Sequence, residues 1–224
     1  MVWFTSLRTS LIIIEMPITT LEARIANAIE AIKSGGTVVY PTETVYGLGA
    51  AALSEEAVMK VYELKRRSLS MPISLAVSSF EMLHEVAHVE QSYMGIITRL
   101  LPGPVTILLR KKEIVPDVLT AHSQVVGVRF PENQIATRII SETGPITATS
   151  ANLTGEKPPV YVEEVKIKAD VIINGGKCKY GIPSTIVDMT KGMKILREGA
   201  NYDRILHVLQ SEAAGKGLHG LSVP

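Results

Sequence analysis

The chain has 224 residues, of which 46% are hydrophobic and 20% are charged, which is enough to bury the core of one α/β domain. A formal net charge of +1 and a sequence pI near 7.8 exclude a global attraction to polyanions, so any phosphate must be held by a local group of basic residues. Cys178 is the sole cysteine, which excludes an internal disulfide, and no stretch reaches the roughly eighteen apolar residues of a membrane span. We therefore expect a cytoplasmic protein.

We interpret residues 1–15 as an N-terminal extension that is not part of the ordered domain. The apolar run 11–14 is too short for a signal peptide and is interrupted by Glu15. A single domain is expected over residues 16–212. Residues 213–224 contain glycines and no hydrophobic periodicity, and we expect a flexible tail there.

The first half of the domain begins with clear helix signals. Thr19 and Glu22 form a capping-box pattern ahead of apolar residues that fall on one helical face up to residue 32. A strand is expected over residues 37–40. Ser54 has the character of a second helix start, and that helix ends in the basic triplet 65–67, where cations suit the helix dipole.

Strands and helices alternate along the rest of the chain. Strands are expected at residues 73–77, 105–109, 125–130, 146–149, 171–173, 185–188 and 193–196, and helices at 80–86, 92–101, 133–142, 162–168 and 202–210. This alternation predicts an α/β fold with a twisted, open sheet flanked by helices, and with sites at the loops that leave strand ends.

Two polar strings in the first third are candidates for ligand contact. Residues 41–49, Pro-Thr-Glu-Thr-Val-Tyr-Gly-Leu-Gly, follow a predicted strand and could bring hydroxyls and backbone N–H groups against a small ligand, or could be an ordinary turn. Lys65 and Arg67 leave a predicted helix and could straddle a triphosphate, or could be a solvated helix end.

Three further strings place polar side chains at strand ends. Arg129 stands in an apolar strand and needs an anionic partner, which is either a substrate carboxylate or a structural acid. Ser150 and Asn152 could read a nucleotide or amino acid, or could cap a turn. If the last two predicted strands form a hairpin, Ser184 and Arg197 could face the same crevice; a plain turn with a surface arginine is the alternative.

Signatures of covalent and zinc chemistry are missing from the sequence. No Walker loop or Gly-x-Ser-x-Gly string occurs, Cys178 is not in a nucleophile motif, and the five histidines lack metal-ligand spacing. The remaining chemistry is binding, positioning and charge neutralisation.

Taken in order, these strings resemble the YrdC-like family of threonylcarbamoyl-AMP synthases. The resemblance covers about residues 21–209, and it rests on strings at 41–49, 65–67, 101–106, 128–131, 149–155, 183–188 and 197–199. The family commonly has a proline and a leucine where this chain has Ser68 and Ile73, which leaves the shape of that loop in question but not its charge.

The resemblance implies a twisted open mixed sheet flanked by helices, with a large concave basic cavity. It also implies an enzyme that makes threonylcarbamoyl-AMP for a tRNA modification from L-threonine, bicarbonate or CO₂, and ATP with Mg²⁺. It assigns threonine to Thr42, Arg129, the backbone around Ala148, and Ser184. It assigns ATP to Lys65, Arg67, Ser150, Asn152 and Arg197, of which Lys65 and Arg67 would be catalytic. No protein metal ligand is implied. The expected partner is a downstream tRNA threonylcarbamoyl transferase complex, and weak RNA binding is a further expectation.

Two other functions compete with this one. A non-catalytic RNA-binding module is disfavoured by the near-neutral charge and by the 5% aromatic content available for base stacking. A carbamoyltransferase that uses carbamoyl phosphate in the same cavity is the second alternative, and replacing bicarbonate by carbamoyl phosphate separates the two.

Overall fold

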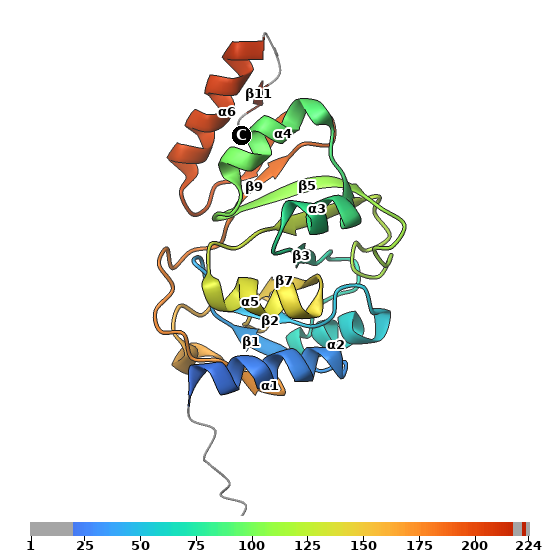
Figure 1. Ribbon diagram of the computed structural model, residues 1–224, viewed down its shortest axis with the longest axis vertical. Coiled ribbons are helices and arrows are strands. Elements are labelled where there is room, and N and C mark those ends of the chain that lie inside the picture. Colours follow the sequence, from blue (N-terminus) through green and yellow to red (C-terminus); the bar gives the residue numbers. More distant parts are fainter. Residues whose placement is uncertain (1–19, 217–220, 223–224) are drawn as a thin grey trace, which may run out of the picture.

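The computed structural model describes residues 20–216 and 221–222, whose centre is a mixed β-sheet (Figure 1). Within these residues the sheet has eleven strands in the order β11-β10-β9-β5-β6-β3-β7-β2-β1-β8, and β4 pairs with β5. The strands are β1 Val38–Tyr40, β2 Gly47–Gly49, β3 Ser74–Ala76, β4 Ala87–His88, β5 Val105–Lys111, β6 Val125–Arg129, β7 Ile146–Ser150, β8 Val171–Ile172, β9 Thr185–Asp188, β10 Met193–Arg197 and β11 Leu221–Ser222.

Parallel and antiparallel pairs alternate irregularly across this sheet. β3 with β6, β5 with β9, β1 with β8 and β10 with β11 are parallel, whereas the other pairs are antiparallel. β9 and β10 pair as an antiparallel hairpin. This is the arrangement under which the sequence analysis expected Ser184 and Arg197 to face the same crevice. The expected mixed, open sheet is confirmed.

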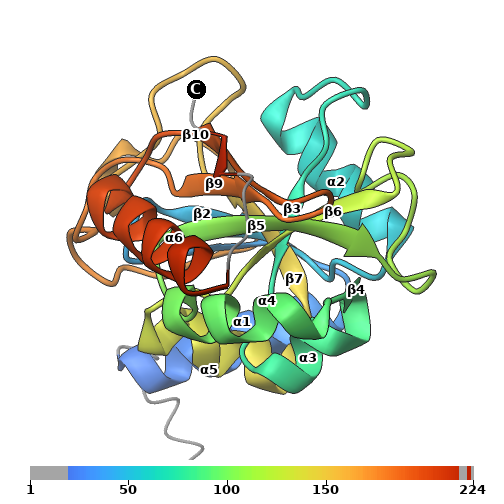
Figure 2. The ribbon, with the colours of Figure 1, turned by 90° about the horizontal axis from the view of Figure 1, so that it is seen from above.

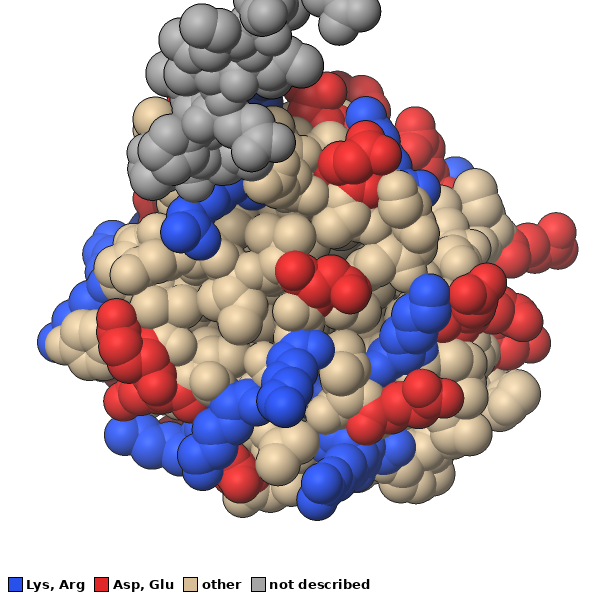
Figure 3. All heavy atoms as spheres, turned by 90° about the horizontal axis from the view of Figure 1, so that it is seen from below, with Lys and Arg blue, Asp and Glu red and all other residues tan. Residues whose placement is uncertain are grey.

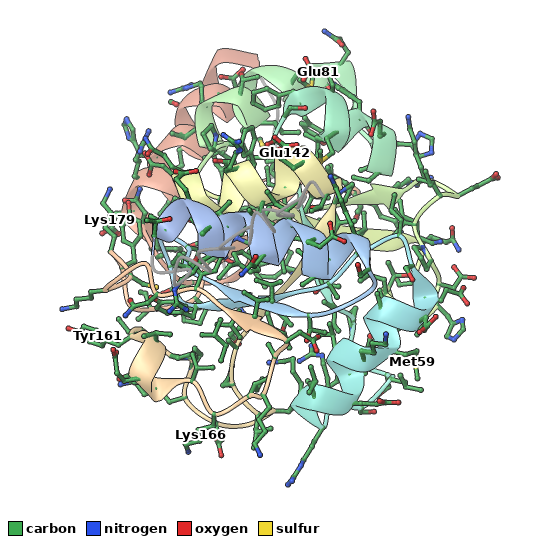
Figure 4. All side chains as sticks on the ribbon, turned by 60° about the horizontal axis from the view of Figure 1, so that its bottom comes forward. Met59, Glu81, Glu142, Tyr161, Lys166 and Lys179 are labelled. Atoms are coloured by element: carbon green, nitrogen blue, oxygen red, sulfur yellow. The ribbon has the colours of Figure 1, made fainter. Side chains whose placement is uncertain are left out.

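Helices cover the sheet unevenly. They are α1 Leu21–Lys33, α2 Glu55–Lys65, α3 Phe80–Val86, α4 Gln91–Leu100, α5 Gln134–Thr143 and α6 Tyr202–Lys216. In Figure 2, α1, α3, α4 and α5 lie together on one side of the sheet, and α2 lies on the other. Figure 4 shows the labelled carboxylates of Glu81 and Glu142 on the outer surface of α3 and α5, as expected for helices that bury only one face.

Helix starts follow the capping rules with one correction. The α1 helix is capped by Thr20, whose side chain accepts from the Ala23 N–H; the predicted cap, Thr19, lies outside the described residues. Ser54 caps α2 as predicted by accepting from the Ala57 N–H. Asn133 caps α5 through two backbone N–H groups.

The buried apolar residues form two clusters. The smaller one packs Ile25 and Ile32 of α1 and Ile139 of α5 against Ile146 of the sheet. The larger one joins residues of β2, β3, β5, β6 and β9 to the apolar faces of α2, α3, α4 and α6. Burial of apolar surface on this scale is the dominant stabilising term, at roughly 25 cal/mol per Å².

The predicted helix over residues 162–168 is wrong. Only the single 3₁₀ turn Val162–Glu164 forms, although the Glu164 carboxylate caps it by accepting from the N–H groups of Val160 and Tyr161. The β-branched residues in this stretch disfavour its continuation as an α-helix. The connection is exposed, and Figure 4 shows Tyr161 and Lys166 on its outer side.

The two ends of the chain differ from expectation or cannot be compared with it. The 1–15 extension lies outside the described residues. The last helix continues to Lys216, beyond the predicted end, and Leu221–Ser222 pair with β10. No helix among the described residues is both long and apolar enough to cross a membrane.

Candidate functional site

A cavity of about 310 Å³ lies where the ends of several strands meet. This volume is at the small end of the range for ligand cavities, about 300–1,000 Å³. Its wall combines the ends of β1, β6, β7 and β10 with the starts of β3, β5 and β9 and the loop after α2. The polar and charged side chains in the wall are Tyr40, Thr42, Tyr46, Arg67, Ser74, Thr106, Arg129, Thr149, Ser150, Ser184 and Arg197.

Glycines on neighbouring strands make room for side chains that line this cavity. A Cβ added to Gly127 would lie 2.4 Å from the Ser74 hydroxyl and 3.2 Å from a methyl of Thr106. A Cβ on Gly47 would lie 2.8 Å from the ring of Tyr40, which covers Gly47 and Gly49. Both positions therefore require glycine, because neighbouring side chains lie too close to the backbone to leave room for a Cβ.

Two arginines in the wall are held by backbone carbonyls. Arg67 donates from Nε to the Met71 carbonyl at 3.0 Å and from Nη2 to the Pro72 carbonyl at 2.9 Å. Arg197 donates from Nη2 and Nε to the Ser184 carbonyl at 2.7 and 3.1 Å. Burial lowers the pKa of both guanidinium groups, and the charge of Arg129 lowers that of Arg197 further. Because these partners are neutral, no carboxylate among the described residues offsets the charge of either arginine.

Lys65 lies behind the wall. Its Nζ donates to the carbonyls of Ser150 and Asn152, at 2.7 Å in the second case, and the residue is 1% exposed. Burial and, to a lesser extent, the charge of Arg67 lower the pKa of Lys65 to about 8. Lys65 thus holds the chain segment that leaves β7.

Arg129 is held by the turn that connects β1 and β2. Its Nη2 donates to Oε1 of Glu43 at 2.5 Å, and its Nη1 donates to the Thr44 hydroxyl at 3.0 Å. The exposed fractions of the two charged side chains are 11% for Arg129 and 2% for Glu43. The structural acid that the sequence analysis left open as a partner of Arg129 is Glu43.

Hydroxyl groups complete the wall. Ser184 lies 2.7 Å from Thr106, oxygen to oxygen, and accepts from Nη2 of Arg197 at 3.3 Å. Thr106, Ser74 and Tyr40 line the cavity although no role was predicted for them. Thr106 stands in the 101–106 string, so the signal was present, whereas nothing in the sequence singles out Ser74.

Seven of the nine predicted site residues come together in the wall: Thr42, Arg67, Arg129, Ala148, Ser150, Ser184 and Arg197. Lys65 and Asn152 are absent from the wall and lie behind it. Asn152 donates to the Leu153 and Glu156 carbonyls, and its buried Oδ1 has no partner among the described residues. Their ligand roles remain predictions.

The part of the chain that the structure describes has no group of three His, Cys, Asp or Glu side chains that could hold a metal ion. The cavity wall itself contains three guanidinium groups and no carboxylate. The site is therefore suited to anions rather than to a cation bound directly by protein.

Known proteins resemble this chain in sequence and in fold. The Sua5/YciO/YrdC family model, described as telomere recombination, matches residues 30–199. The threonylcarbamoyl-AMP synthase of Pyrococcus abyssi is 38% identical over 78% of this chain and 53% of its own length, and that of Bacillus subtilis is 32% identical over 90% and 61%. The chain thus spans somewhat more than half the length of these relatives. The crystal structure of P. abyssi Sua5 complexed with L-threonine matches with a TM-score of 0.80 and 33% identity, over 92% of this chain and 60% of that one.

Proposed function

This chain belongs to the Sua5/YciO/YrdC family, and from that membership we propose that it is a threonylcarbamoyl-AMP synthase, which joins L-threonine, bicarbonate or CO₂, and ATP and releases pyrophosphate. The observation that carries the proposal is the collection of Arg67, Arg129 and Arg197 around one cavity whose wall has no acidic side chain. A site of this charge suits two anionic reactants, a polyphosphate and a carboxylate.

The reaction needs alignment and charge stabilisation but no protein nucleophile. The threonine nitrogen forms a bond to the carbon of CO₂ and loses a proton, either to solvent or, where bicarbonate supplies the CO₂, to the hydroxide that bicarbonate releases, which leaves as water. A carbamate oxygen then attacks the α-phosphorus, and the bond to the β-phosphate oxygen breaks. Charge grows on the non-bridging and leaving oxygens, where fixed cations stabilise it most.

Within this proposal Arg67 and Arg197 are the cations for the phosphates, because the protein leaves their charge uncompensated. Arg129 is the group for the threonine carboxylate. Ser150 and Ser184 offer hydroxyls beside them. Lys65 supports the phosphate side from behind through the carbonyls of Ser150 and Asn152.

We propose that magnesium enters with ATP, bound to its phosphates and water, since the described residues offer no ligand cluster for it. Its contribution would be to neutralise charge on the leaving pyrophosphate. A downstream tRNA threonylcarbamoyl transferase complex would take up the product, which water would otherwise hydrolyse.

The surface in Figure 3 bears on RNA binding. On that face Lys and Arg side chains alternate with Asp and Glu, so the face lacks the single-sign field that a phosphate backbone requires. Any RNA contact from this face is therefore expected to be weak.

The deciding experiment incubates the protein with ATP, magnesium, bicarbonate and each amino acid in turn, and measures pyrophosphate and adenylate by mass. Threonine-dependent adenylate supports the proposal. Product formation only with carbamoyl phosphate would identify a carbamoyltransferase instead. RNA binding with steep salt dependence and no ATP turnover would identify a binding module.

A further inference from the structure

The turn formed by residues 42–45 surrounds one edge of the Arg129 guanidinium. Glu43 holds Nη2 and Thr44 holds Nη1, and the three groups are buried. Nε of Arg129 and Oε2 of Glu43 are buried without a partner among the described residues. Buried polar atoms normally have hydrogen-bond partners, so these two unpaired atoms indicate that the pair has a role beyond mutual neutralisation.

Donor and acceptor roles in this turn follow from chemistry. The Thr42 hydroxyl donates to the Val45 carbonyl at 2.6 Å, since a carbonyl can only accept. The contact of 2.9 Å between the Thr42 and Thr44 hydroxyls must therefore be donated by Thr44. Thr44 is left with its lone pairs for Arg129, which can only donate.

One consequence concerns Thr42, which was predicted to bind threonine directly. Its hydroxyl hydrogen is used by Val45, and its oxygen also accepts from the N–H groups of Thr44 and Val45. The hydroxyl has no hydrogen left for a ligand. Its contribution is to fix the turn that presents Glu43 and Thr44.

Charge gives Glu43 a second purpose. Three guanidinium groups share the cavity wall, and Arg129 and Arg197 are close enough for their charges to interact. Without Glu43, Arg129 would be repelled by its neighbour and free to move toward any nearby oxygen. A carboxylate at 2.5 Å fixes both its position and its direction.

We infer that Glu43 and Thr44 are positioning residues: they hold the Arg129 guanidinium so that its remaining N–H groups can receive a carboxylate, and they act only through Arg129. This inference rests on the proposed function for the identity of the carboxylate, L-threonine. The alternative is a buried ion pair that serves stability alone.

The first test compares Glu43→Gln and Thr44→Val with wild type by calorimetry of L-threonine and of ATP. Gln and Val keep the shapes of Glu and Thr, so we expect threonine affinity to fall by about tenfold, with ATP affinity changed by less than about twofold. Asp170→Asn is the matched control, because Asp170 holds the N–H and hydroxyl of Thr37 outside the cavity. It should leave both affinities unchanged.

A double-mutant cycle separates positioning from stability. In an Arg129→Met background, Glu43→Gln should cause no further loss of threonine affinity. A further loss there, an equal loss of ATP affinity, or unchanged threonine affinity in the single variant would overturn the inference.

A measurement without ligand tests the positioning role of Glu43 independently of the proposed function. The Nε–H resonance of Arg129 should be sharp and protected from solvent exchange in wild type, and broadened or fast-exchanging in Glu43→Gln. An unchanged resonance would contradict the positioning role. If wild type instead binds no threonine and releases no pyrophosphate, the proposed function fails, while this resonance still decides whether Glu43 fixes Arg129.

Discussion

Two sides of one cavity hold their cations in different ways. Arg129 is paired with a buried carboxylate, whereas the partners of Arg67 and Arg197 among the described residues are neutral: backbone carbonyls for both, and the Ser184 hydroxyl in addition for Arg197. Lys65, behind the wall, belongs with the second group because its partners are also carbonyls. The protein thus compensates the charge on one side and leaves it uncompensated on the other.

This difference corresponds to the two proposed reactants. A triphosphate carries several negative charges and gains most from cations that no acid has already neutralised. An amino acid has one carboxylate and an ammonium group, so orientation matters more than net charge. Carbonyls can aim a guanidinium without neutralising it, and a carboxylate both aims and neutralises.

The largest expected effect tests the uncompensated side. Arg197→Met should reduce threonine-dependent pyrophosphate release by about 10²–10³-fold, the usual loss for one preorganised donor to developing charge. Lys194→Met is the control, since Lys194 is an exposed cation on the same strand, β10. An unaltered rate in Arg197→Met, measured at saturating ATP, would end the distinction between the two sides.

The next effect tests the compensated side. Arg129→Met should weaken L-threonine binding by about a hundredfold and ATP binding by less than about threefold, because a charge-assisted bidentate contact contributes roughly 1.5–3 kcal/mol. Calorimetry with each ligand measures both. The matched control is Arg138→Met, an exposed arginine of α5 paired with Glu142. Equal weakening of both ligands would show that the cavity does not divide in this way.

The sequence predicted most elements that bury one apolar face. α3 was predicted at its observed bounds, and β9 likewise, because hydrophobic period and flanking turn residues agree there. β2 was missed because two of its three residues are glycines, which strand propensity disfavours. Those glycines are needed for the ring of Tyr40, a contact between strands that only the folded chain reveals.

The sequence predicted which residue types form the site, but not which of them line the cavity and which lie behind its wall. The strings pointed to arginines that do line the cavity, yet nothing local distinguishes Arg67, in the wall, from Lys65, two positions earlier and behind it. That difference arises because Lys65 is the last residue of α2, whereas Arg66 adopts a left-handed conformation with φ of 49° and redirects the chain. Glu43 escaped notice because its partner lies 86 residues away.

A smaller effect sharpens the boundary between the two sides. Gly127→Ala would place a methyl group against Ser74 and Thr106, beside Arg129, and should destabilise the fold by about 1–3 kcal/mol through overpacking. Urea denaturation measures this, and threonine binding should suffer more than ATP binding. Gly95→Ala is the control: the added Cβ on α4 meets only ordinary contact, so stability should be unchanged or raised by up to about 1 kcal/mol. An equal loss of affinity for both ligands in Gly127→Ala would show that the packing around Ser74 does not affect threonine binding in particular.

The smallest effect examines Lys65 as a cation that no carboxylate compensates. Its pKa falls from the usual 10.5 to about 8 in the folded protein, so between these values the unfolded chain binds the extra proton. Stability must then rise with pH in that window, and the rise belongs to Lys65 if it disappears in Lys65→Met. The difference in unfolding free energy, wild type minus Lys65→Met, should grow by about 1 kcal/mol between pH 8 and pH 9. Urea titrations at the two pH values measure it. A difference that does not change with pH would mean that the carbonyls of Ser150 and Asn152 stabilise protonated Lys65 as well as water does. Cations held by carbonyls at this site would then bear no desolvation cost that a bound phosphate could offset.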